Sequence, residues 1–209
     1  MFQKHRNDIA SISGPRAANA RLSQFLRRRI TVIRFCNHCG SSVSFYVPPG
    51  DSLPRHVCDA CGHIHYENPR LVVGCVAEWE GRILLCRRAI EPRHGFWTLP
   101  AGFMENGEST AQGAGRETYE EAGAKVIIDA PFAMVSVPHI NQVHLFYRGR
   151  LATPDYSAGE ESLEVDLFAP EAIPWPELAF RTVELCLRRY LADRQRERFG
   201  FHESELPPL

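Results

Sequence analysis

The sequence of 209 residues contains no uninterrupted apolar run that approaches 18 residues, so no segment is expected to cross a membrane as a helix. The first 34 residues also lack the apolar core of a secretory signal. They hold one acidic residue against eight basic ones, a composition typical of organelle transit peptides. We interpret residues 1–34 as a basic, disordered tail, and we expect a cytoplasmic protein, with organelle import left open.

Basic residues are scarce in the rest of the chain. The tail's eight basic residues and one acidic residue leave 16 of the 24 basic and 24 of the 25 acidic residues for positions 35–209. An acidic body repels the phosphate backbone of nucleic acids. We therefore expect a small-molecule substrate, no nucleic-acid partner and no membrane partner, and we leave a homodimer open.

The seven cysteines divide into two groups. Cys36-x2-Cys39 and Cys58-x2-Cys61 form two knuckles with eighteen residues between them, a spacing typical of a zinc ribbon. Four thiolates close a tetrahedral Zn²⁺ site and leave no position for a catalytic water, so a structural zinc is predicted over residues 35–66. Two disulfides are the competing interpretation. They are typical of secreted proteins and would leave three cysteines unpaired in apolar segments (Cys75, Cys86 and Cys186).

The stretch over residues 102–124 carries a dense group of chemically active side chains. A helix is predicted over residues 109–122, because Ser109 or Thr110 can cap its start and Gly123 can adopt the left-handed conformation that ends it. On this helix three carboxylates share one arc of about 100° (Glu117, Glu120 and Glu121). Such a group favours a hard divalent cation, Mg²⁺ with Mn²⁺ as a substitute, over the alternative of a solvated helix face.

The spacing within this stretch resembles the Nudix box, G-x5-E-x7-R-E-U-x-E-E-x-G-U, in which U is a bulky aliphatic residue. Every fixed position is matched, by Gly102, Glu108, Arg116, Glu117, Glu120, Glu121 and Gly123. Thr118 and Ala124 stand where aliphatic residues are usual, and both positions concern packing. The resemblance implies an α/β fold, the Nudix α/β/α sandwich around a mixed sheet, over residues 67–209, after the small zinc ribbon.

The resemblance also implies roles for individual residues. Glu117, Glu120 and Glu121, called here the box glutamates, would bind Mg²⁺ together with the Gly102 carbonyl group. Arg116 would orient them through an ion pair with Glu108. The general base stays open among three glutamates, one in the box and two in a loop predicted over residues 154–164 (Glu117, Glu161 and Glu164).

Four features together resemble one branch of zinc-ribbon Nudix hydrolases: the ribbon, the Asn68-Pro69 linker, the WTLPAGF stretch of residues 97–103 and the ESLE loop of residues 161–164. That branch includes a plant chloroplast enzyme that splits FAD and ADP-ribose, so the resemblance implies cleavage of the pyrophosphate bond in such compounds. NADH pyrophosphatases are the first alternative. They carry a Ser-Gln-Pro-Trp-Pro-Phe-Pro stretch where this chain has SVPHINQ over residues 136–142. A zinc-ribbon binding module with a non-catalytic Nudix scaffold is the second, and the intact set of box glutamates argues against it.

The remaining pattern indicates strands on both sides of the box helix. Alternating or continuous apolar residues predict strands over 71–79, 82–87, 96–100, 126–128, 132–137 and 142–151. A final helix is predicted from Pro176, with Phe180, Val183, Leu187 and Tyr190 facing the core.

Overall fold

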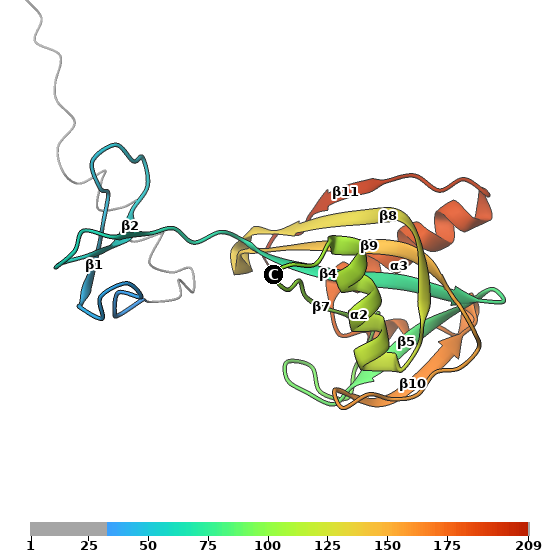
Figure 1. Ribbon diagram of the computed structural model, residues 1–209. Coiled ribbons are helices and arrows are strands. Elements are labelled where there is room, and N and C mark those ends of the chain that lie inside the picture. The colour runs from blue at the N-terminus through green and yellow to red at the C-terminus, as the bar shows by residue number, and fades with distance from the viewer. Residues whose placement is uncertain (1–32, 209) are drawn as a thin grey trace, which may run out of the picture. The chain divides into compact units, whose positions relative to one another are not determined.

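The computed structural model describes residues 33–208, and the chain divides between Glu67 and Asn68 into two compact units (Figure 1). The tail predicted over residues 1–34 lies outside the described residues except for its last two. In the part that is described, no helix is long and apolar enough to cross a membrane.

The first unit is a three-stranded antiparallel sheet in the order β1-β2-β3. Its strands are β1 (Val43–Tyr46), β2 (Arg55–Cys58) and β3 (Ile64–His65). Few of its apolar side chains are buried, among them Cys36, Val57 and Cys58. So small a core does not stabilise a segment of this length by itself, which is the usual situation of domains that depend on a cross-link or a metal.

The second unit is built on one mixed sheet with the strand order β10-β5-β4-β9-β8-β11. β4 pairs in parallel with β9, β8 pairs in parallel with β11, and the other pairs are antiparallel. Two short strands extend it, β6 beside β5 and β7 beside β4. The strands are β4 (Arg70–Trp79), β5 (Arg82–Arg88), β6 (Trp97–Thr98), β7 (Ala101–Phe103), β8 (Val126–Val137), β9 (Gln142–Leu151), β10 (Ser162–Phe168) and β11 (His202–Glu205).

Two helices, α2 (Thr110–Ala122) and α3 (Arg181–Gln195), pack against opposite faces of this sheet (Figure 1). The alternation of side chains along β4 explains why both faces are apolar. Val76 packs with residues of α3 such as Leu187, whereas Cys75 and Ala77 pack on the other face with Ala122 of α2. The predicted α/β sandwich with a mixed sheet is therefore confirmed.

The final helix was predicted to begin at Pro176, and this is wrong. The helix begins at Arg181, after two 3-10 turns, η2 (Pro170–Ala172) and η3 (Trp175–Glu177). A proline disfavours helical geometry at the residue before it, so Pro174 and Pro176 limit this segment to short turns. The chain then runs beside β6, where the Ala179 N–H donates to the Trp97 carbonyl oxygen at 2.8 Å.

Three strand predictions also need correction, and one strand was missed. The strand predicted over residues 96–100 is limited to β6, and β7 follows as a separate strand. Residues 126–137 form one strand rather than two, and its register shifts near Pro131 show that bulges accommodate the proline. β10 begins at Ser162, inside the segment predicted as a loop over residues 154–164. β11 was not predicted, because its sequence HESE is polar throughout and carries no apolar pattern.

Candidate active site

Helix α2 holds the box glutamates on a well-capped support. The Ser109 hydroxyl accepts a hydrogen bond from the Gln112 N–H at 3.2 Å, and the Gln112 side chain accepts one from the Ser109 N–H at 2.8 Å. This capping box satisfies the first amides of the helix. At the other end Gly123 has a φ of 59°, and its N–H donates to the Tyr119 carbonyl oxygen. The structure confirms both predicted caps.

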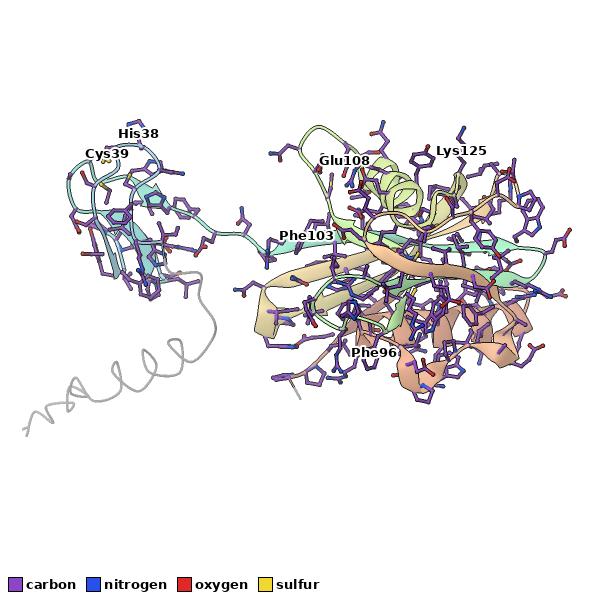
Figure 2. The ribbon with its side chains drawn as sticks, turned by 90° about the horizontal axis from the view of Figure 1, so that it is seen from below. His38, Cys39, Phe96, Phe103, Glu108 and Lys125 are labelled. Atoms are coloured by element: carbon purple, nitrogen blue, oxygen red, sulfur yellow. The ribbon has the colours of Figure 1, made fainter. Side chains whose placement is uncertain are left out.

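The guanidinium group of Arg116 lies among three carboxylates and one backbone carbonyl group. It forms a bidentate pair with Glu108, which lies beside α2 (Figure 2), with N···O distances of 3.0 and 2.8 Å. One of its Nη groups also donates to Glu117 Oε1 and to Glu120 Oε2, each at 2.8 Å. The other donates to the Phe103 carbonyl oxygen at 3.2 Å. The hydrogen bonds from Arg116, with a further one from the Glu105 N–H, lower the pKa of Glu108 to about 2.

Two of the box glutamates are buried. Glu121 is 6 % exposed and accepts a hydrogen bond from the Ala101 N–H at 3.1 Å. Burial raises its pKa to about 8, and burial is also the main cause that raises the pKa of Glu117. A Cβ atom at position 102 would displace the Glu117 carboxylate, which occupies that space, so glycine here lets Glu117 keep its position.

The residues present fit a divalent cation. Mg²⁺ binds oxygen donors, and the site offers several, including the poorly solvated carboxylates of Glu117 and Glu121. A bound cation would offset the desolvation that raises the pKa values of these two glutamates. The box glutamates do not converge on one point, since within the described part of the chain only the four ribbon cysteines bring at least three ligand atoms within 4.8 Å of one another. Arg116 holds Glu117 and Glu120 in their present positions.

The loop after β9 is tied to the C-terminal end of α2. The Ser157 N–H donates to the Ala122 carbonyl oxygen at 2.8 Å, and the Gly159 N–H donates to the Glu121 carbonyl oxygen at 3.1 Å. A side chain at Gly159 would collide with the Glu120 carbonyl group. This close packing brings Glu161 near enough to raise the pKa values of two box glutamates further.

Glu164 lies apart from this group. It belongs to β10, pairs with Arg87 at 3.5 Å and does not line the cavity described next. Of the two loop glutamates named as candidate bases from the sequence, Glu161 lines the cavity beside the box and Glu164 does not.

A cavity of about 960 Å³ opens from the box toward the start of α3. The box glutamates, Gly102 and Arg116 line one end of it, and the first turn of α3 lines another part. Apolar side chains form much of the wall between, including Val72, Val137 and Phe146. Ligand pockets usually measure about 300–1,000 Å³, so this cavity suits a ligand larger than a mononucleotide.

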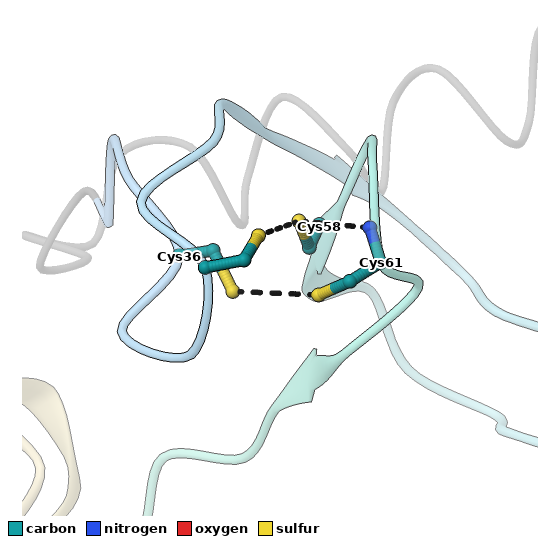
Figure 3. A group of neighbouring side chains, drawn as sticks. Cys36, Cys58 and Cys61 are labelled. Atoms are coloured by element: carbon teal, nitrogen blue, oxygen red, sulfur yellow. Dashed lines mark hydrogen bonds between the residues drawn. The ribbon is translucent and has the colours of Figure 1, made fainter.

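The four ribbon cysteines point their sulfur atoms toward one another (Figure 3). The Sγ atoms of Cys36 and Cys61 are 3.8 Å apart, and those of Cys39 and Cys58 are 3.4 Å apart. Thiolates around a tetrahedral zinc, with Zn–S bonds of about 2.3 Å, stand about 3.8 Å from one another. All four are free cysteines, so the geometry fits zinc and gives no support to the two disulfides.

Two family models match this chain in succession. A zinc-ribbon model described as Nudix N-terminal matches residues 34–67, and a model described as NUDIX domain matches residues 68–186. The second match covers more than half of the sequence. The chain belongs to the Nudix hydrolase family.

Individual Nudix proteins are similar to different extents. A crystal structure of a Nudix hydrolase from Nitrosomonas europaea is 49 % identical, with a TM-score of 0.81, and the match covers 83 % of this chain and 99 % of that one. An NAD-capped RNA hydrolase, NudC, from Chromobacterium violaceum is 37 % identical over 111 residues, which are 53 % of this chain and 38 % of that one. The chain thus spans less than half the length of this curated relative.

An ADP-ribose pyrophosphatase from Streptococcus suis shows the same fold at lower similarity. Its crystal structure has a TM-score of 0.51 and 20 % sequence identity, and the match covers 66 % of this chain and all of that one. At this identity the likeness concerns the fold alone.

We expect one Zn²⁺ per chain in the ribbon of this Nudix protein. Metal analysis after dialysis without a strong chelator measures it directly. Cys58→Ser removes a buried ligand, so the first unit should lose its protection from amide exchange while residues 68–208 still melt cooperatively. Zinc-free protein with four reduced cysteines and a folded first unit would rule the site out.

The metal-free protein is expected to lose stability as the pH rises from about 4.5 to about 8. Over this range Glu121 is protonated in the folded state and ionised in the unfolded state, so ionisation favours unfolding, and the loss is complete above its folded pKa of about 8. Glu121→Gln removes this contribution. In EDTA the variant should be more stable than the wild type at pH 8 and closer to it at pH 4.5, as measured by denaturant unfolding. Parallel pH profiles for the two proteins would contradict the assigned burial.

Several residues around the cavity were not found from the sequence. Arg88 ends β5, His144 lies in β9 and Thr182 lies in the first turn of α3, and all three line the cavity. Nothing in their local spacing marks them, because they come together only when β5, β9 and α3 pack. Trp97, which starts the WTLPAGF stretch, packs in the core against Phe168 with ring centroids 4.8 Å apart and does not line the cavity.

Proposed function

We propose that this protein hydrolyses the pyrophosphate bond of nucleoside diphosphate compounds that contain an AMP half, with FAD and ADP-ribose as its main substrates. The observation that carries the proposal is the cavity of about 960 Å³ with the Nudix carboxylates and Arg116 at one end. Its volume suits a ligand larger than a mononucleotide, with the diphosphate held near α2. The resemblance to the FAD and ADP-ribose branch supports the same substrate class.

Each part of the site has a role in this reaction. Mg²⁺, bound by the box glutamates and the Gly102 carbonyl, would supply positive charge to the diphosphate and acidify a water. Arg116 keeps Glu117 and Glu120 in place through its pair with Glu108. Glu161, on the loop anchored to α2, lines the cavity and is our preferred base for deprotonating the attacking water, with Glu117 second.

Cleavage of NADH or NAD is the second candidate function. It is supported by the 37 % identity to a NudC protein whose printed name refers to NAD-capped RNA. That name also argues against the expectation that the protein has no nucleic-acid partner, because an RNA substrate would place polynucleotide at the cavity entrance. The SVPHINQ stretch over residues 136–142 argues against this candidate, and the acidic charge balance argues against the RNA substrate.

A substrate panel with Mg²⁺ separates these candidates. FAD, ADP-ribose, NADH and ATP are assayed at equal concentrations, and the products are identified by chromatography. The proposal predicts AMP from FAD and ADP-ribose with higher kcat/KM than from NADH, and no turnover of ATP. Preference for NADH by tenfold or more would favour the second candidate.

A further inference from the structure

The hydroxyl group of Thr182 is buried without a hydrogen-bond partner among the described residues. The residue is 4 % exposed, its Oγ1 atom is unpaired, and it lines the cavity. A valine of the same shape would avoid the cost of burying an unpaired hydroxyl. A polar group in this position therefore indicates a ligand that supplies the missing bond.

The backbone around Thr182 offers further donors. It lies in the first turn of α3, a helix of 15 residues whose N-cap, Phe180, makes no side-chain capping bond. The first amides of a helix lack the usual acceptor four residues earlier. The Val183 N–H here already donates to the Phe180 carbonyl oxygen at 3.1 Å, so the free donors are the N–H groups of Arg181 and Thr182, and the helix dipole adds positive potential at this end. Phe180, Arg181 and Val183 line the cavity together with Thr182, so this helix end belongs to the cavity wall.

Arg88 extends this donor surface toward the box. It is 9 % exposed, and its guanidinium lies 5.1 Å from the centre of the Phe180 ring. Its Nε group donates to the Pro92 carbonyl oxygen at 2.9 Å, and it lines the cavity together with the box glutamates. Arg88 thus connects the box glutamates with the start of α3.

Another part of the cavity lining combines apolar side chains with polar ones, and the buried Nδ1 atom of His139 there also has no hydrogen-bond partner among the described residues. Val137, Ile140 and Phe146 contribute to it. His144 also lines the cavity, where burial lowers its pKa to about 4 and keeps its ring neutral, and the ring is hydrogen-bonded to the Gln142 side chain at 2.9 Å. Apolar side chains with hydrogen-bond donors nearby suit a flat ring that carries carbonyl oxygens. The same apolar side chains would not stabilise a second phosphate group.

We propose that Thr182, the first amides of α3 and Arg88 bind the carbonyl-bearing edge of a second planar ring in a dinucleotide substrate. This inference rests on the proposed function, because it places the diphosphate at the box glutamates and the second ring at α3. It makes Thr182 a specificity-determining residue. FAD and NADH carry such a ring and ADP-ribose does not, so the site distinguishes dinucleotides from ADP-ribose.

Thr182→Val tests the proposal kinetically. We expect KM for FAD or NADH to rise about 3- to 10-fold, the value of one neutral hydrogen bond, with kcat little changed and ADP-ribose kinetics unaffected. The melting temperature should stay equal or rise, because an unpaired hydroxyl has been removed. Thr118→Val is the matched control, since Thr118 is fully buried in α2, bonds the Ala114 carbonyl oxygen and lies outside the cavity lining.

A binding measurement keeps this inference separate from the proposed function. FMN, nicotinamide mononucleotide and AMP are titrated into metal-free wild-type protein and Thr182→Val, without any turnover. Weaker binding of FMN or nicotinamide mononucleotide with unchanged AMP binding supports the ring site, even if no dinucleotide is hydrolysed. Equal binding of all three ligands by both proteins, or a loss confined to AMP, overturns it, and it does so whether or not Mg²⁺-dependent hydrolysis is found.

Discussion

Replacing Glu120 with glutamine is expected to lower kcat by about 10³, because the change removes one charge from the group that binds the metal and the developing transition state. The fold should survive. The Glu120 side chain is 55 % exposed, and an amide oxygen can still accept the hydrogen bond from Arg116. Turnover of FAD and ADP-ribose at saturating Mg²⁺ measures the effect, and thermal unfolding checks the fold.

A matched control is available on the other helix. Glu184 of α3 also pairs with an arginine one turn away, Arg188, at 2.8 Å, and it lies outside the cavity lining. Glu184→Gln should leave kcat unchanged. Turnover of Glu120→Gln near that of this control would show that the box glutamates do not carry the chemistry.

Replacing Arg116 with methionine should affect both stability and catalysis. The change deletes the hydrogen bonds to Glu108, Glu117, Glu120 and the Phe103 carbonyl and leaves partly buried carboxylates without their cation. Removing only the cation from such a cluster should lower the free energy of unfolding by about 2–4 kcal/mol, less than for a fully buried pair. We also expect kcat to fall about 100-fold. Denaturant unfolding in EDTA and steady-state kinetics measure the two effects.

Mg²⁺ titrations distinguish a positioning role from a structural one. Added Mg²⁺ should restore part of the lost stability, since it replaces the missing positive charge, while the apparent Mg²⁺ affinity of Arg116→Met should differ from that of the wild type. Arg188→Met is the control, as the Arg188 and Glu184 side chains are 58 % and 40 % exposed and their pair should contribute less than about 1 kcal/mol. If Arg116→Met lost stability but kept wild-type kinetics and Mg²⁺ affinity, Arg116 would be structural only.

The box helix and the ribbon could be predicted closely because their signals are local. Ser109 and Gly123 mark the ends of α2 through backbone capping, which depends on neighbouring residues alone. The two cysteine knuckles likewise place their ligands by short turns, in which Gly40 and Gly62 have φ values of 76° and 71°. Local chemistry of this kind is readable without knowledge of the fold.

Other features depend on packing between distant segments. The segment before α3 is held extended as far as Ala179, where, in addition to the effect of Pro174 and Pro176, the Ala179 N–H bonds to Trp97, far away in the sequence. β11 forms because its backbone pairs with β8. Its polar side chains give no sequence pattern from which this pairing could be predicted. The cavity wall formed by Arg88, His144 and Thr182 has the same origin, so the box was identified from the sequence and the far end of the site was not.

Product analysis in water enriched in ¹⁸O tests the central claim most directly. The wild-type protein is incubated with FAD or ADP-ribose and Mg²⁺, and the products are examined by mass spectrometry. The account predicts FMN plus AMP from FAD and AMP plus ribose 5-phosphate from ADP-ribose, without free phosphate or pyrophosphate, and with ¹⁸O on one phosphoryl product only. Turnover confined to nucleoside triphosphates, with pyrophosphate released, would contradict it.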